Sequence, residues 1–168
     1  MPKHEFARLW RHLVTDHRTA RRSFPPPVFT RIGSAVAAGE HKHSGQVRLV
    51  VEAALPLSLV LRGEKPRARA LDVFSRLRIW DTEDNIGVLV YVLLADKAVE
   101  IVADRGIHRR VGDAAWRSIC RTMEAAFRKG RFEDGAVAGI DAINAMLAEH
   151  FPRRGAGPNE LSDQPEII

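Results

Sequence analysis

Residues 88–103, VLVYVLLADKAVEIVA, contain two short apolar runs that decide the fold. The first run, 88–94, is apolar throughout, which is typical of a strand that is buried on both faces of a sheet. The second run, 98–103, follows after only three residues, Ala95-Asp96-Lys97. So short a connection predicts an antiparallel hairpin.

The segment before this hairpin predicts a different kind of strand pairing. Residues 46–55 indicate a strand, because apolar and polar side chains alternate at its start and Pro56 ends it. Residues 66–80 carry apolar side chains at helical spacing behind Pro66, a favourable first helical residue. A strand, a helix and a second strand in this order predict a right-handed parallel crossover, so we expect a mixed sheet.

Further helices are predicted on both sides of these strands. Apolar residues recur at helical spacing in 29–36, in 116–127 behind Asp113 as the expected cap, and in 137–151. Such helices would cover both faces of a sheet whose central strands are apolar. The predicted fold class is therefore α/β, a three-layer α/β/α sandwich with a small mixed sheet.

The length of 168 residues suits one domain with tails. We predict three parts: an N-terminal amphipathic helix with a basic linker (1–22), the α/β domain (23–152) and a flexible C-terminal tail (153–168). The tail is assigned because its composition turns to Gly, Pro and charged residues.

The N-terminal helix is predicted from Phe6, Leu9, Trp10 and Leu13, which recur at helical spacing. We expect this apolar face to pack on the α/β domain. The alternative is that the helix lies on an anionic membrane leaflet, because basic residues flank its apolar face.

Composition limits the class of protein. The formal net charge is +5, and its arginines are spread along the chain, so we expect a solvated basic surface and no specific nucleic-acid binding. Cys120 is the only cysteine, which excludes an intramolecular disulfide and a zinc site built on several thiolates. The first residues lack the apolar core of a signal peptide, and the longest apolar run, 86–94, is too short to cross a bilayer. We expect a cytoplasmic protein, free or peripheral to the inner membrane.

Three strings in the chain are similar to hallmarks of the TPM domain family. They are SGQVR at 44–48, WDTEDNIGVL at 80–89 and EIVADRGI at 100–107. Their order and spacing, over roughly 27–151, make the chain resemble this family, and in particular its short bacterial stand-alone members. The resemblance implies a Rossmann-like α/β/α domain. Many relatives are exported or membrane-anchored, and this sequence departs from that pattern.

The resemblance implies several different activities on one fold. Family members have been linked to a calcium-binding acid phosphatase of chloroplasts, to photosystem repair and to modulation of a receptor channel. Because one fold supports such different activities, the activity of this chain has to be inferred from a functional site.

The predicted topology brings three polar segments to one edge of the sheet: 41–44, 81–85 and 104–108. Oxygen ligands suit hard cations, and a calcium ion or another divalent cation is the only cofactor that we predict, with no organic cofactor. The candidate ligands are Asp81, Asp84 and Asp104, with Glu83, Asn85, His43 and His108 as further candidates.

An EF-hand does not fit this segment. Asp81, Glu83 and Asn85 have the alternate spacing of the first ligands of a calcium loop, but Ile86 and Val92 stand where the loop needs glycine and its final acidic ligand. The alternative for the aspartates is a local turn, in which they hydrogen-bond the backbone or solvent.

Basic side chains near the same edge are open to two interpretations. His41 and His43 would project together only from an extended segment, and exposed loop histidines are the alternative to a transition-metal site. Arg105, Arg109 and Arg110 could hold a phosphate through bidentate contacts, or could simply be solvated.

The usual phosphatase machinery is absent from the sequence. Cys120 is followed six residues later by Ala126 where a thiolate mechanism needs arginine, and Asp81 and Asp84 precede a strand instead of ending one. Only metal-assisted hydrolysis stays open, with Asp84 as the candidate catalytic residue.

The sequence is therefore compatible with two functions. The first is a non-catalytic accessory or interaction module, with Trp80 and the N-terminal helix around Trp10 as contact surfaces and with an unidentified protein partner, including a membrane protein. The second is a cation-dependent acid phosphatase-like phosphoester hydrolase. The two differ in whether Asp84→Asn abolishes a turnover that the unchanged protein has.

Overall fold

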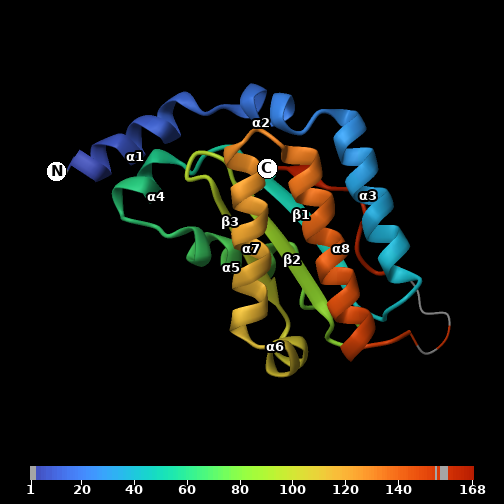
Figure 1. Cartoon of the computed structure of the whole chain (residues 1–168). Coiled ribbons are helices and arrows are strands. Elements are labelled where there is room, and N and C mark those ends of the chain that lie inside the picture. The colour runs from blue at the N-terminus through green and yellow to red at the C-terminus, as the bar shows by residue number, and fades with distance from the viewer. Residues whose placement is uncertain (1–2, 154, 156–158) are drawn as a thin grey trace.

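The computed structural model describes residues 3–153, 155 and 159–168. In these residues, strands form one mixed sheet in the order β3-β2-β1-β4 (Figure 1). The strands are β1 (Gln46–Glu52), β2 (Gly87–Leu93), β3 (Ala98–Ala103) and β4 (Glu166–Ile167). β1 runs parallel to β2 and β4, and β2 runs antiparallel to β3. The predicted parallel pair, the hairpin and the mixed sheet are confirmed.

β2 is buried along its whole length, as its apolar composition predicts. Alternate side chains, from Val88 and Leu89 onward, belong to two different core clusters. This division follows because successive side chains of a strand point to opposite faces of the sheet. The strand therefore needs helices on both faces.

Helices supply these two covering layers (Figure 1). One face packs on α3 (Pro26–Glu40), α7 (Asp113–Arg128) and α8 (Phe132–His150). The opposite face packs on α5 (Pro66–Arg76), with α4 (Leu57–Leu61) beside it. The three-layer α/β/α sandwich is confirmed.

Three helices lie where the sequence analysis predicts none. They are α2 (His17–Ser23), α4 and α6 (Arg105–Val111). Each spans only seven residues or fewer, so none has room for a repeated apolar stripe. The predicted basic linker is therefore helical at α2, where the Asp16 side chain accepts a hydrogen bond from the backbone N–H of Thr19 at 2.9 Å.

The expected cap of α7 is also corrected. Asp113 is the first residue of this helix, and Gly112, with φ of 78°, occupies the cap position. An aspartate in the first turn is still stabilised by the positive end of the helix dipole. Aspartate is therefore common both at the cap position and just after it.

The C-terminal segment differs from the predicted flexible tail. Glu166 and Ile167 pair with Val50 and Val51 as a parallel strand, and the backbone N–H of Ile168 donates to Val51 O at 2.9 Å. Glu166 also lies 3.0 Å from Arg48. Residues 154 and 156–158 of the predicted tail lie outside the described part of the chain. The remainder covers the outer edge of β1.

Candidate functional site

The polar edge predicted from the topology exists in the sheet. Gln46 is in register with Gly87, and Ala103 ends β3 beside Val88, so the segments before β1, before β2 and after β3 meet at one edge. The backbone N–H of Asp104 donates to Gly87 O at 2.9 Å and ties the last two segments together.

The turn at 81–85 is held largely by its own side chains and by the C-terminal segment. Asp81 pairs with Arg78 at 2.7 Å, and the Thr82 hydroxyl accepts from the backbone N–H of Ile86 at 3.1 Å. The Glu160 carboxylate accepts from the backbone N–H of Glu83 at 2.9 Å. Of these contacts, the one made by a predicted ligand is the ion pair of Asp81 with Arg78.

The remaining turn residues face solvent. Asp84 and Asn85 are both exposed, and Asn85 adopts a positive φ of 53°, which asparagine tolerates better than most residues.

Asp104 is the acidic residue at this edge with an unusual environment. Its Oδ1 accepts from the backbone N–H of Arg105 at 3.0 Å and caps α6. Its Oδ2 is buried and has no hydrogen-bond partner among the described residues. Burial raises the pKa of Asp104. A buried carboxylate oxygen without a partner is costly, and a cation or a proton would relieve it.

His43 lies in the core between the start of β1 and α8. The ring is fully buried, with Nδ1 3.1 Å from Gly45 O and Nε2 3.1 Å from Asn144 Oδ1. Asn144 is oriented in turn by donating to Ala35 O at 2.9 Å. Burial lowers the pKa of His43. A metal could reach either ring nitrogen only by replacing one of these contacts.

Gly39 makes room for this arrangement. A Cβ atom on Gly39 would lie only 2.1 Å from Cγ of Asn144, so α3 and α8 approach each other as closely as they do because residue 39 has no side chain. The position of Asn144, and through it of His43, depends on this close approach.

The basic residues of α6 divide between protein contacts and solvent. His108 lies 3.2 Å from Asp113, and Arg110 donates to His150 O at 3.1 Å and stacks over Phe151. Arg105 and Arg109 are exposed. All three arginines are therefore exposed, and Arg110 is the one with contacts to α8 and Phe151.

The described side chains at this edge are not arranged as a metal site. Within residues 3–153, 155 and 159–168, no group of three or more His, Cys, Asp or Glu side chains is placed to hold one. The unpartnered Oδ2 of Asp104 is a single ligand atom, so the described residues do not form a prepared metal site. The cation ligands predicted from the sequence stay predictions.

A second candidate site lies on α1 (Lys3–Val14), which begins at the outer rim of the molecule in Figure 1. α1 does pack on the domain, but of the four residues that predict its apolar face, Leu9 alone packs against the core. Phe6, Trp10, Leu13 and Val14 are 62%, 57%, 58% and 54% exposed. We call these four residues the α1 apolar stripe. They recur at helical spacing, so they share one face.

The opposite face of α1 is polar and holds the helix on the domain. Arg8 donates to the Asp96 carboxylate, with 2.8 Å between Nη2 and Oδ2. His12 is buried, with Nε2 3.2 Å from Asp96, and its Nδ1 accepts from the backbone N–H of Leu55 at 3.0 Å. Arg11 donates to Ala95 O at 2.9 Å. The helix is therefore attached through charge and hydrogen bonds as well as through the apolar side chain of Leu9. Apolar periodicity does not detect the polar contacts.

The electrostatics of Asp96 reflect this clamp. Burial raises the pKa of Asp96, but His12 and Arg8 beside it outweigh that effect and hold the pKa well below its usual range. Its side chain is only 9% exposed. The sequence shows the two parts of this contact separately, as an aspartate in a predicted hairpin turn and an N-terminal helix with two arginines.

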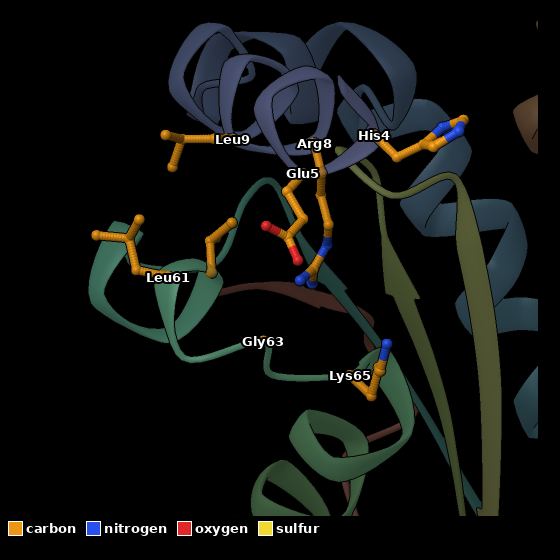
Figure 2. A pocket seen from close by; sticks show the side chains of 8 residues that line it. His4, Glu5, Arg8, Leu9, Leu61, Gly63 and Lys65 are labelled. Carbon is orange, nitrogen blue, oxygen red and sulfur yellow. The ribbon is translucent and has the colours of Figure 1, made fainter. Parts of the chain in front are cut away.

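A pocket of about 250 Å³ lies between α1 and the segment 60–65 (Figure 2). Leu9 and Leu61 line one end of it, and the side chains of Glu5 and Arg8 point from α1 toward Lys65. Arg8 is already engaged, because its Nη2 also donates to Glu64 O at 2.7 Å. The pocket is therefore a small cleft lined by both apolar and charged side chains.

A buried network that the sequence analysis missed lies at the carboxyl ends of β1 and β2. The Tyr91 hydroxyl donates to Glu52 at 2.5 Å, and Arg69 holds the same carboxylate through two bonds of 2.8 and 2.9 Å. Burial and the Glu52 charge raise the pKa of Tyr91. Both carboxylate oxygens of Glu52 therefore have hydrogen-bond partners within the protein.

Among the described residues, no helix combines the length and the apolar character that a bilayer crossing requires.

Residues 24–146 match the family described as the TPM domain. Among solved structures, the chain is similar to the BA42 protein of the psychrophilic bacterium Bizionia argentinensis, determined by NMR, with 29% identity and a TM-score of 0.74. The match covers 84% of this chain and 93% of that protein. A comparison with curated proteins found no match.

Proposed function

Because this chain belongs to the TPM domain family, whose fold does not define one activity, we propose that it is a non-catalytic interaction module and that its contact surface is the α1 apolar stripe. The observation that carries the proposal is the direction of the stripe. Phe6, Trp10 and Leu13 point away from the domain that the other face of α1 holds. The partner is a protein, including a membrane protein, or a membrane surface.

Exposed apolar side chains that gather on one face, with polar residues around them, mark contact sites on soluble domains. A single exposed leucine would need no such explanation. Here the exposed side chains include an aromatic pair, Phe6 and Trp10, and aromatic residues are enriched at interfaces. The clamp at Asp96 fixes the direction in which they face.

The proposal is tested with a photo-crosslinking amino acid placed at residue 13 in the full chain, expressed in cells. The matched control places it at residue 71, since Leu71 is also an exposed apolar residue, 47% exposed, but lies on α5. We expect crosslinked protein or lipid from residue 13 and little from residue 71. Equal crosslinking from both positions, or none from either, would contradict the proposed contact surface.

A second candidate function is a cation-dependent phosphoester hydrolase. It is favoured by the buried Oδ2 of Asp104, which lacks a partner among the described residues at the edge where the turn 81–85 also lies. The candidate ligands for calcium or another divalent cation are Asp81, Asp84 and Asp104. Glu83, Asn85, His43 and His108 are further candidates, and Asp84 is the candidate catalytic residue.

Thermal unfolding with and without calcium, magnesium, manganese and zinc tests this second candidate. Binding to the native state adds about 2.7 kcal/mol of stability at a hundredfold excess over the dissociation constant. A shift that is lost in Asp104→Asn and in Asp81→Asn/Asp84→Asn, but kept in Asp113→Asn, would support the cation site. Phosphomonoester turnover that Asp84→Asn abolishes would then support hydrolysis, and no shift with any metal would exclude both.

A further inference from the structure

We infer that the α1 apolar stripe binds the surface of a lipid leaflet rich in anionic headgroups. The inference rests on the proposed function, because it names the partner of the same surface. It is carried by the shape of the stripe, by the charge around it and by the way α1 is held.

The shape of the stripe suits a flat, fluid surface. Phe6, Trp10, Leu13 and Val14 follow one another along the helix, so they form a ridge and not a hollow. Helices that lie in a membrane interface bury such an apolar face to a depth of about 5–10 Å while their polar face stays outside. The polar face of α1 is the one that the domain occupies.

Positive charge is concentrated around the stripe. Residues 4–22 contain five Arg residues and two acidic residues, Glu5 and Asp16, and two of the arginines, Arg8 and Arg11, are paired with Asp96. Arg18, Arg21 and Arg22 are exposed on α2, which begins three residues after the last residue of α1. Basic residues beside an interfacial helix are attracted by the negative surface potential of an anionic leaflet.

The same charge disfavours a second copy of the chain as the occupant. Two copies that met through their stripes would bring two arginine-rich segments together. Like charges across an interface oppose association, whereas anionic headgroups neutralise them. Charge complementarity therefore selects the leaflet over self-association.

The helix is also formed before it binds. An isolated helix of 12 residues is marginal in water, so many interfacial helices must fold on the membrane. Here Asp96 and the contacts of Arg8 and His12 hold α1 on the domain. Binding then does not have to supply the ordering free energy of the helix.

The test uses the purified full chain and sedimentation with vesicles. One set is pure phosphatidylcholine, and the other contains about 30% phosphatidylglycerol to supply anionic charge. We expect binding to the anionic vesicles alone, with an affinity that falls as salt is raised because the headgroup charge is screened. Phe6→Ser/Trp10→Ser/Leu13→Ser should weaken this binding by roughly a hundredfold.

Two further variants separate charge from general apolar exposure. Arg18→Gln/Arg21→Gln/Arg22→Gln should weaken binding to the anionic vesicles by at least roughly tenfold and flatten its salt dependence. Leu71→Ser removes an exposed apolar side chain on α5 and should leave binding unchanged. Thermal unfolding of each variant checks that the exposed substitutions leave the fold intact.

Three outcomes would overturn the inference. They are no binding to either vesicle, equal binding to both, and binding to anionic vesicles that the stripe variant does not weaken. If residue 13 nevertheless crosslinks to a protein, or sedimentation equilibrium shows dimers that the stripe variant abolishes, the proposed contact surface stands and only the lipid partner is wrong. If residue 13 crosslinks to nothing as well, both proposals fail.

Discussion

Arg8 on α1 and Asp96 in the turn between β2 and β3 form a two-pronged contact across 88 residues of sequence. Nε of Arg8 lies 3.1 Å from both carboxylate oxygens of Asp96, and Nη2 lies 2.8 Å from Oδ2. Paired donors of a guanidinium match a carboxylate in distance and direction, which makes such contacts among the stronger ones in proteins. This contact fixes the direction in which α1 presents its apolar stripe.

Substitution Asp96→Ala should release α1 from the domain. Removing one partner of a largely buried ion pair leaves Arg8 and His12 without their acceptor, and costs roughly 3–5 kcal/mol in well-buried cases. Because Arg8 is partly exposed, we expect the lower end of this range. Urea unfolding measures the change in the free energy of unfolding, and hydrogen exchange should show α1 amides exchanging faster.

The control for Asp96 is Asp72→Ala, which removes a half-exposed acid that pairs with Arg69 and Arg76. It should cost about 1 kcal/mol or less. The pKa of Asp96 is held low, so its stabilisation is present above the unfolded value near 4 and is lost only as pH falls through the lower folded value. If Asp72→Ala and Asp96→Ala lower the free energy of unfolding equally, the Asp96 contact does not hold α1 on the domain.

Glu40 should make stability fall as pH rises. Burial and the neighbouring Asp163 raise the pKa of Glu40 to about 7, although Arg153 opposes this. The folded state therefore keeps a proton that the unfolded chain releases near pH 4.5. The stabilisation is complete below that pH and is lost as pH rises to about 7, by about 1–3 kcal/mol in the free energy of unfolding.

The measurement is urea unfolding at several pH values between 4.5 and 8, compared with Glu40→Gln. The glutamine has no proton to lose, so the part of the slope due to residue 40 should disappear. The variant should be at least as stable as the unchanged protein near pH 8. An unchanged slope in Glu40→Gln would show that another group is responsible.

Gly39→Ala should destabilise the contact between α3 and α8. The new Cβ would lie 2.1 to 2.4 Å from three side-chain atoms of Asn144, so Asn144 must move and lose its contacts with His43 and Ala35 O. We expect a loss of about 2–4 kcal/mol in the free energy of unfolding, from steric overlap and a broken buried network.

Gly106→Ala is the matched control for Gly39→Ala. The nearest atom to its new Cβ would be Asn85 O at 3.8 Å, an ordinary contact distance. Its loss should stay within about 0.5 kcal/mol. If thermal unfolding finds the two alanine variants equally stable, the close approach of α3 and α8 does not depend on residue 39.

Removal of residues 166–168 should expose the outer edge of β1. The free N–H and C=O groups of an uncovered edge strand pair readily with another chain, so we expect association that increases with protein concentration. Light scattering at several concentrations detects it. Glu166→Ala removes the contact with Arg48 but keeps the strand, and should remain as dispersed as the unchanged protein.

The sheet and its covering helices could be predicted from the sequence because they follow apolar periodicity. The hairpin of β2 and β3 and the crossover through α5 depend on local signals alone, namely a short turn and Pro66. The short helices α4 and α6 could not be predicted, because five to seven residues hold too few apolar positions to show a period.

The candidate sites were harder to predict because they depend on contacts between distant segments. The convergence of three polar segments follows from strand direction and is present in the fold, but the partners of Asp81 and His43 do not follow from it. For α1 the periodicity of the stripe is right and its direction is wrong. A stripe shows which residues share a face, whereas the side that meets the domain was decided by Asp96, some 80 residues away.

Because β4 lies at the end of the sequence, its pairing with β1 forms late in synthesis. Val50 and Glu166 are partners in this sheet, so the outer edge of β1 stays uncovered while the ribosome makes every residue between them. A nascent chain in that interval presents an open strand edge to its neighbours, the kind of surface that chaperones bind. The time spent translating the segment between β1 and β4 is therefore the period in which this chain is most exposed to misassembly.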